Sequence, residues 1–225
     1  MQFAIFDLDH TLLPIDSGDT WTRYLIRQLG DKAPELMQKA IDINTAYREG
    51  RFDADDAVRF QLSLLTYVPY DVLLALRAAF LEQYVWPTIT PSALELVSQC
   101  RREGAHCVLA SGTHRFVTSP IAERFGMDAL IAATPEQDAQ GEFTGRLVGS
   151  HSYGEGKRRL LEAYIASFSG PHQLRAFTDS INDLPLLEWV EQQGGEPVAV
   201  NPDPRLAQVA QRRGWTQRVL FAQGD

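Results

Sequence analysis

Two carboxylates one residue apart follow the first apolar run of the chain. Asp7 and Asp9 come directly after residues 3–6, with one leucine between them, and Thr11 stands two positions further on. Side chains alternate along an extended strand, so we expect both carboxylates to point the same way. Such a pair could hold a metal ion, act as acid and base, or provide a nucleophile and its helper. The alternative is a strand that ends in a turn with two solvated carboxylates.

Two later apolar runs, 105–110 and 174–178, also end in polar residues, and a lysine stands at a helix start between them. These residues are Ser111, Gly112, Lys157, Asp179, Asn182 and Asp183. Taken singly, each has an ordinary explanation as a helix lysine, a strand-to-helix turn or a helix cap. Their occurrence together is therefore the informative observation.

A regular scaffold must position these residues, and the chain after residue 86 supplies one. The pattern predicts strands near 105–110, 129–132, 174–178 and 197–200 and helices near 92–103, 115–125, 154–168 and 203–213. A hairpin is expected over 141–147, which glycines punctuate. This order is typical of an α/β fold with a doubly wound parallel sheet. Such sheets bind ligands in the crevice beyond the carboxyl ends of their strands.

The stretch before residue 86 has a different pattern. It contains four successive apolar stripes of helical spacing and no strand signal; the second stripe is Leu36, Ala40, Ile43 and Tyr47. Four consecutive helices do not belong to a simple alternating sheet, so we expect an inserted helical domain over 16–86. Residues 1–15 and 87–225 would form the core, with the insert over the tip of the first strand.

The composition bounds the class of protein. Of the 225 residues 44% are hydrophobic, enough for a sizeable core, and the formal net charge is −8. An acidic chain without a basic stripe argues against a nucleic-acid partner. No apolar stretch approaches the ~20 residues of a membrane span and no signal-peptide pattern is present, so we expect no membrane partner and a cytoplasmic location. Cys100 and Cys107 fit no metal or redox pattern.

The polar clusters follow the order and spacing of the four motifs of the haloacid dehalogenase (HAD) superfamily of phosphohydrolases. Asp7, Asp9 and Thr11 resemble the first motif, and the remaining clusters resemble the second to fourth. The helical insert is similar to the type 1 cap of subfamily IB, which contains the phosphoserine phosphatases, most closely over 49–65. The resemblance implies a Mg²⁺-dependent phosphatase that hydrolyses a small phosphate ester.

The resemblance also implies a role for each residue. Asp7 attacks phosphorus and forms an aspartyl-phosphate, while Asp9 protonates the leaving alkoxide and then activates water. Mg²⁺ is held by Asp7, Asp179 and the backbone carbonyl of Asp9, with Asp183 at or near the metal. The groups expected beside the phosphoryl oxygens and the substrate are Thr11, Ser111, Gly112, Lys157 and Asn182, and Thr11 is also expected to brace the turn.

Two further positions bear on the substrate. In the phosphoserine phosphatases an acidic residue past the first motif binds the amino group of serine and a cap arginine binds its carboxylate; these positions fall on Asp16 and Gln61. A neutral amide cannot form the charged bidentate pair, although Arg51 or Arg59 could substitute for the arginine. We therefore expect an alcohol with an amine and no carboxylate, as in histidinol phosphate, phosphoethanolamine or phosphocholine, with phosphoserine as the runner-up.

Other functions have to be weighed. A haloacid dehalogenase needs no acid two residues after its nucleophile, so Asp9 argues against it. A phosphotransferase or phosphomutase would use the same phosphoenzyme with a longer lifetime. A non-catalytic binding protein on this fold would be expected to lack a motif residue, and none is missing. A P-loop enzyme is excluded, because His151 stands where the loop requires its first glycine.

Overall fold

A computed structural model describes residues 1–49 and 51–221, and its centre is a parallel sheet. The six strands lie in the order β3-β2-β1-β6-β7-β8, and every adjacent pair is parallel. Their bounds are β1 Gln2–Phe6, β2 His106–Ala110, β3 Ala129–Ile131, β6 Gln173–Thr178, β7 Glu196–Val200 and β8 Thr216–Arg218. The predicted α/β fold with a doubly wound parallel sheet is confirmed.

Both faces of the sheet are buried. In β1, Ala4 and Phe6 pack into one apolar cluster, whereas Phe3 and Ile5 pack into the other. The first face is covered by α5 (Pro91–Arg102) and α6 (Arg115–Phe125), and the second by α7 (Glu155–Ala166), α8 (Leu184–Gln192) and α9 (Pro204–Arg213). Burial on both sides explains why the strands are continuous apolar runs in the sequence.

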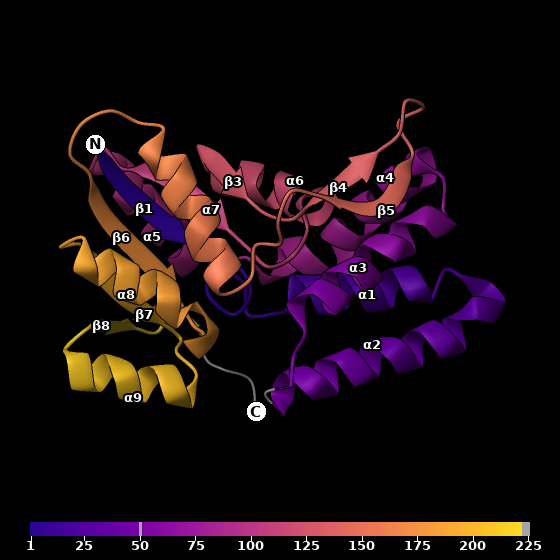
Figure 1. Ribbon diagram of the computed structural model, residues 1–225, viewed down its shortest axis with the longest axis horizontal. Coiled ribbons are helices and arrows are strands. Elements are labelled where there is room, and N and C mark those ends of the chain that lie inside the picture. The colour runs from indigo at the N-terminus through magenta and orange to yellow at the C-terminus, as the bar shows by residue number, and fades with distance from the viewer. Residues whose placement is uncertain (50, 222–225) are drawn as a thin grey trace.

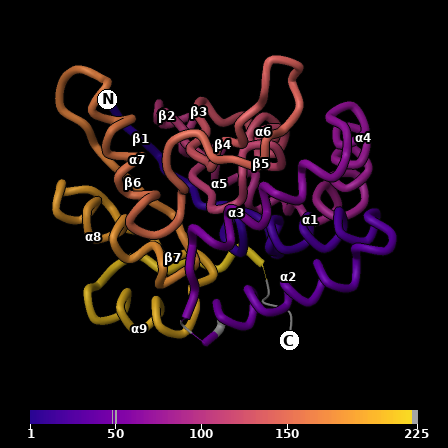
Figure 2. Tube along the Cα trace, turned by 45° about the vertical axis from the view of Figure 1, so that its right-hand side comes forward, coloured from indigo at the N-terminus to yellow at the C-terminus, as the bar shows by residue number. Residues whose placement is uncertain are grey.

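The first four α-helices after β1 form a group beside the sheet (Figures 1 and 2). They are α1 (Ser17–Ile26), α2 (Ala33–Arg48), α3 (Ala54–Leu64) and α4 (Tyr70–Phe80), as the four apolar stripes predict. Among the described residues, no single helix is long and apolar enough to cross a membrane; only the pair Ala54–Tyr67 and Tyr70–Thr88, bent by 113°, reaches that length and composition together.

An antiparallel hairpin connects the core to these helices. It consists of β4 (Thr134–Gln137) and β5 (Phe143–Val148), and β5 lies along α3 (Figure 1). The Glu142 carboxylate accepts a hydrogen bond from the Tyr70 amide at 2.9 Å, and the rings of Tyr70 and Phe143 pack edge to face. The sequence predicted the whole hairpin within 141–147, but these residues hold only its turn and most of its second strand; the first strand comes earlier and contains Pro135, a residue that weakens the strand signal.

Candidate active site

The strand order β2-β1-β6 brings three of the polar clusters side by side. Asp7 continues β1, and its amide donates to the carbonyl of Phe177 at 2.9 Å. Lys157, in the first turn of α7, donates from Nζ to Asp7 Oδ1 at 2.7 Å and to Asp183 Oδ2 at 2.6 Å. Residues that are 150 positions apart in the sequence therefore meet at the carboxyl end of the sheet.

Lys157 is a buried cation held by two carboxylates. Burial alone would lower its pKa, but the charges of Asp183 and Asp7 and the hydrogen bonds to them raise the pKa above its usual value. The ammonium therefore stays charged at neutral pH. The start of α7 packs closely against the preceding loop. A Cβ atom added at Gly156 would lie only 2.6 Å from the carbonyl oxygen of His151.

Thr11 lies beneath the site and ties the first motif to the fourth. Its hydroxyl is 3.0 Å from Asp7 Oδ2 and 3.1 Å from Asp179 Oδ1, and it accepts from the Asp179 amide at 3.0 Å. Asn201 donates to the carbonyls of His10 and Thr11, and His10 has a left-handed φ of 59°. These contacts favour the predicted bracing role. The cavity described below does not include Thr11, which we therefore no longer place against the substrate.

Asp9 accepts a hydrogen bond on each carboxyl oxygen. The Ser17 amide donates to Oδ1 at 2.7 Å, and the Thr113 hydroxyl donates to Oδ2 at 2.9 Å. Burial, followed by the charges of Asp16 and Asp7, raises the pKa of Asp9 to about 7. A carboxyl group in that range can both hold and release a proton at neutral pH, as a general acid and base must.

Thr113 is a residue that the sequence interpretation missed, although it directly follows Ser111 and Gly112. We expect Thr113→Val to lower kcat/KM about tenfold to a hundredfold, since a hydrogen bond to a charged group is worth about 1.5–3 kcal/mol. Thr113→Ser keeps the hydroxyl and should retain most activity. Steady-state kinetics of both variants test this, and equal activity of the valine variant and the wild type would contradict the role.

A cavity of about 180 Å³ opens above these residues. This volume is well above the roughly 10–15 Å³ that a single water molecule needs, so the cavity can hold several waters or a small ligand. Of the predicted site residues, those that line it are Asp7, Asp9, Asp16, Gln61, Gly112, Lys157, Asp179, Asn182 and Asp183. Ser111 does not: it is fully buried and its hydroxyl accepts from the Thr113 amide at 3.1 Å. Its role at the phosphoryl group stays a prediction.

The cavity is strongly acidic. Of the described side chains, the groups with formal charge on its wall are six aspartates and one lysine, namely Asp7, Asp9, Asp16, Asp19, Asp179, Asp183 and Lys157. Asp19 is paired with Arg23 at 2.7 Å. Asp16 caps α1 by accepting from the Asp19 amide at 2.7 Å, and burial raises its pKa. The wall therefore favours a cationic group beside the phosphate.

Neither arginine that could have replaced the cap arginine reaches this cavity. Gln61 on α3 lines it, whereas Arg59 is exposed and lies outside its wall. Arg51 is also exposed and forms an ion pair with Glu49. Among the side chains that the structure describes, which exclude that of Arg48, no arginine lines the cavity.

The aspartates fit a magnesium ion by donor type and by charge. Burial, followed by the charges of Asp7 and Asp183, raises the pKa of Asp179 to about 9. The single proton of the Thr11 hydroxyl cannot serve its contacts to both Asp7 and Asp179. A divalent cation would relieve this crowding, and carboxylate oxygens are ligands that Mg²⁺ prefers. Among the described residues, no group of three His, Cys, Asp or Glu side chains is already arranged to hold a metal ion. Asp7 and Asp183 each direct one oxygen at Lys157.

Aromatic residues form another part of the wall that the sequence interpretation missed. Tyr47 and Phe52 come from the helical segment and Tyr153 from the core, and all three line the cavity. The apolar stripe of α2 predicts Tyr47 as a packing residue, but the residue is 42% exposed. Helical periodicity identifies the face of α2 but does not show that this face ends over the active site.

Comparisons with known proteins agree with this arrangement. The sequence profile described as haloacid dehalogenase-like hydrolase matches residues 4–188. A histidinol-phosphatase of Neisseria meningitidis is 33% identical over 95% of this chain and 96% of its own length. A phosphoserine phosphatase of Mycobacterium tuberculosis is 33% identical over 96% of this chain and 70% of its own length.

Among solved structures, a protein described as having unknown function from Bordetella pertussis superposes with a TM-score of 0.90 at 36% identity, covering 98% of this chain and 99% of that one. The profile match, the similar relatives and the meeting of all four motifs at one cavity lead to the same assignment. The chain belongs to the haloacid dehalogenase-like hydrolase family.

Proposed function

We propose that the protein is a phosphatase that hydrolyses a small phosphate monoester at the Asp7 carboxylate. The observation that carries the proposal is the placement of Asp7, Asp9 and Lys157 on the wall of one cavity. An oxygen of Asp7 attacks phosphorus, and the bond between phosphorus and the alcohol oxygen breaks while Asp9 supplies the proton. Water, deprotonated by Asp9, then attacks the aspartyl-phosphate, releasing phosphate and regenerating Asp7. Lys157 offsets charge on the phosphoryl oxygens.

Mg²⁺ is the cofactor that these carboxylates suit, with Asp7, Asp179, the Asp9 carbonyl and Asp183 as its proposed ligands. When bound, it would neutralise the phosphate dianion that must approach the carboxylates. We expect activity to fall to background in EDTA and to return when Mg²⁺ is added in excess. Hydrolysis of p-nitrophenyl phosphate measures this directly. Full activity after exhaustive chelation would contradict the assignment. Adding Zn²⁺ in place of Mg²⁺ is the control that shows whether the recovered activity is specific to Mg²⁺.

The helical segment 16–86 is proposed to act as a cap that selects the leaving group. Its residues Asp16 and Gln61 line the same cavity as Asp7, which supports a role in substrate choice. Aspartates suit an ammonium group, and the neutral Gln61 offers no charged partner for a carboxylate. We therefore propose an amino-alcohol phosphate, with histidinol phosphate first because a similar relative bears the name histidinol-phosphatase. Phosphoserine is the alternative, because another similar relative is named a phosphoserine phosphatase.

A panel of phosphate esters tests this choice. We expect histidinol phosphate, phosphoethanolamine or phosphocholine to exceed phosphoserine and a sugar phosphate by at least about tenfold in kcat/KM, which corresponds to about 1.4 kcal/mol. Gln61→Arg should shift the preference toward phosphoserine, whereas Arg59→Gln, outside the cavity, should leave the ranking unchanged. A wild-type preference for phosphoserine of about tenfold or more would refute the argument from Gln61.

A further inference from the structure

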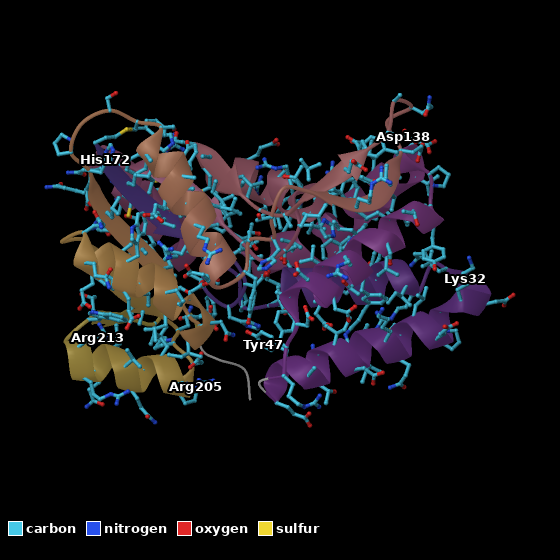
Figure 3. The ribbon with its side chains drawn as sticks, viewed as in Figure 1. Lys32, Tyr47, Asp138, His172, Arg205 and Arg213 are labelled. Carbon is cyan, nitrogen blue, oxygen red and sulfur yellow. The ribbon has the colours of Figure 1, made fainter. Side chains whose placement is uncertain are left out.

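The hydroxyl of Tyr47 contacts the loop of the fourth motif across the junction between the helical segment and the core. Tyr47 lies in the last turn of α2, and Asn182 lies in the 3-10 turn Ile181–Asp183 of the connection after β6, which we call the fourth-motif loop. Asn182 Nδ2 donates to the Tyr47 hydroxyl oxygen at 2.8 Å, although the two residues are 135 positions apart in the sequence. Figure 3 places Tyr47 where the end of α2 approaches the core.

Two further core residues lie near the same hydroxyl. The side chains of Ser180 and Tyr153 are close enough to affect its pKa, in addition to Asn182, which donates a hydrogen bond to it. Ser180, like Asn182, belongs to the fourth motif, and Tyr153 belongs to the loop that leads into the Lys157 helix. Burial raises the pKa of Tyr47, so the phenol keeps its proton and can both donate and accept.

Ring contacts hold the hydroxyl in this place. The Tyr47 ring packs on Phe52 with centroids 5.2 Å apart and on Tyr153 at 6.3 Å, and Phe52 and Tyr153 are 4.8 Å apart. These three rings join the helical segment to the core at the edge of the cavity. An aromatic side chain has few rotatable bonds, so it holds a polar group in place at a small entropic cost.

We infer that Tyr47 is a positioning residue that docks the helical segment onto the fourth-motif loop and fixes the amide of Asn182 toward the substrate. This inference rests on the proposed function and extends it. Asn182 lines the cavity, and its amide nitrogen has one hydrogen already directed at Tyr47, which sets the orientation of the remaining hydrogen and of the amide oxygen. The site is therefore complete only when α2 is seated against the core.

The decisive variant is Tyr47→Phe, which removes the hydroxyl and keeps the ring contacts. We expect kcat/KM to fall about tenfold, mainly through kcat, because a bound substrate meets a less ordered Asn182. In an Asn182→Ala background the same change should have less than about a twofold effect, since its partner is already absent. Tyr67→Phe is a matched control, because Tyr67 is also 42% exposed and lies outside the cavity wall.

Amide hydrogen exchange supplies a readout that does not depend on turnover. Tyr47→Phe should accelerate exchange in the fourth-motif loop and in the last turn of α2, with a thermal midpoint close to that of the wild type and no change in Tyr67→Phe. Additive kinetic effects in the double variant, or unchanged exchange in that loop, would overturn the inference. A wild type that hydrolyses no ester in the panel would instead reject the proposed function, while the exchange experiment would still decide whether Tyr47 holds the loop.

Discussion

Replacement of Asp7 by asparagine is expected to lower kcat by more than about a hundredfold, because the amide cannot attack phosphorus. The side chain keeps its shape and can still accept a hydrogen bond from Lys157 through its amide oxygen. The contact with Thr11 can likewise be kept, so the fold should be retained. The expected result is a soluble protein with a near-native circular dichroism spectrum and almost no turnover.

Steady-state kinetics on p-nitrophenyl phosphate and on the best ester of the panel measure the loss. Asp42→Asn is a suitable control, because it is the same substitution at a residue of α2 that does not line the cavity. Asp42 accepts a hydrogen bond from Gln38. Beryllium fluoride, a mimic of the acyl phosphate, should inhibit the wild type and fail to bind the Asp7 variant. Retention of more than about a hundredth of wild-type kcat would refute a covalent role for Asp7.

The sequence predicts the centre of the site well, for a physical reason. Asp7, Ser111 and Asp179 each directly follow an apolar strand, and parallel strands place such positions along one edge of a sheet. The contacts of Lys157 with Asp7 and Asp183 follow from that topology once α7 packs on the sheet. The fold and the meeting of the motifs could therefore be predicted without coordinates.

The hydrogen bonds of the residues after the second strand, Ser111 and Thr113, could not be predicted in the same way. Ser111 stands at the expected strand end, but its side-chain oxygen accepts from the Thr113 amide while the Thr113 hydroxyl contacts Asp9. Which of two neighbouring hydroxyl groups faces the cavity depends on the turn and on close packing against α1. A Cβ atom at Gly18 would lie only 2.6 Å from the Thr113 hydroxyl, a contact that no local pattern reveals.

The junction between the helical segment and the core is less predictable still. Tyr47 continues an apolar stripe in the sequence, and only the docking of α2 against the fourth-motif loop brings it to Asn182. Arg59 differs, because helical periodicity alone places it on another side of the helix from Gln61, and the structure shows it exposed and outside the cavity wall. The contact between Tyr47 and Asn182 depends on how the helical segment packs on the sheet core, so sequence periodicity does not determine it.

Replacement of Lys157 by methionine is the second change for which we expect a large effect, on stability as well as on activity. Its side chain is 4% exposed and contacts the carboxylates of Asp7 and Asp183. Methionine has a similar length but leaves these buried charges without their cation. Removing one partner of a buried ion pair typically costs about 3–5 kcal/mol, so we expect a loss of that size in the unfolding free energy without Mg²⁺. Loss of the charge beside the phosphoryl group should lower kcat more than about a hundredfold.

Urea unfolding monitored by fluorescence, with and without Mg²⁺, separates the two effects of Lys157. If repulsion between the uncompensated carboxylates causes the loss of stability, Asp183→Asn in the Lys157→Met background should restore part of it, because one carboxylate is removed. The double variant should not regain turnover. Mg²⁺ should stabilise the single variant more than the wild type, since the cation replaces part of the missing charge. Arg159→Met, an exposed change on the same helix, should cost less than about 1 kcal/mol. A Lys157→Met protein as stable and as active as the wild type would show that the lysine is not the charge that holds these carboxylates together.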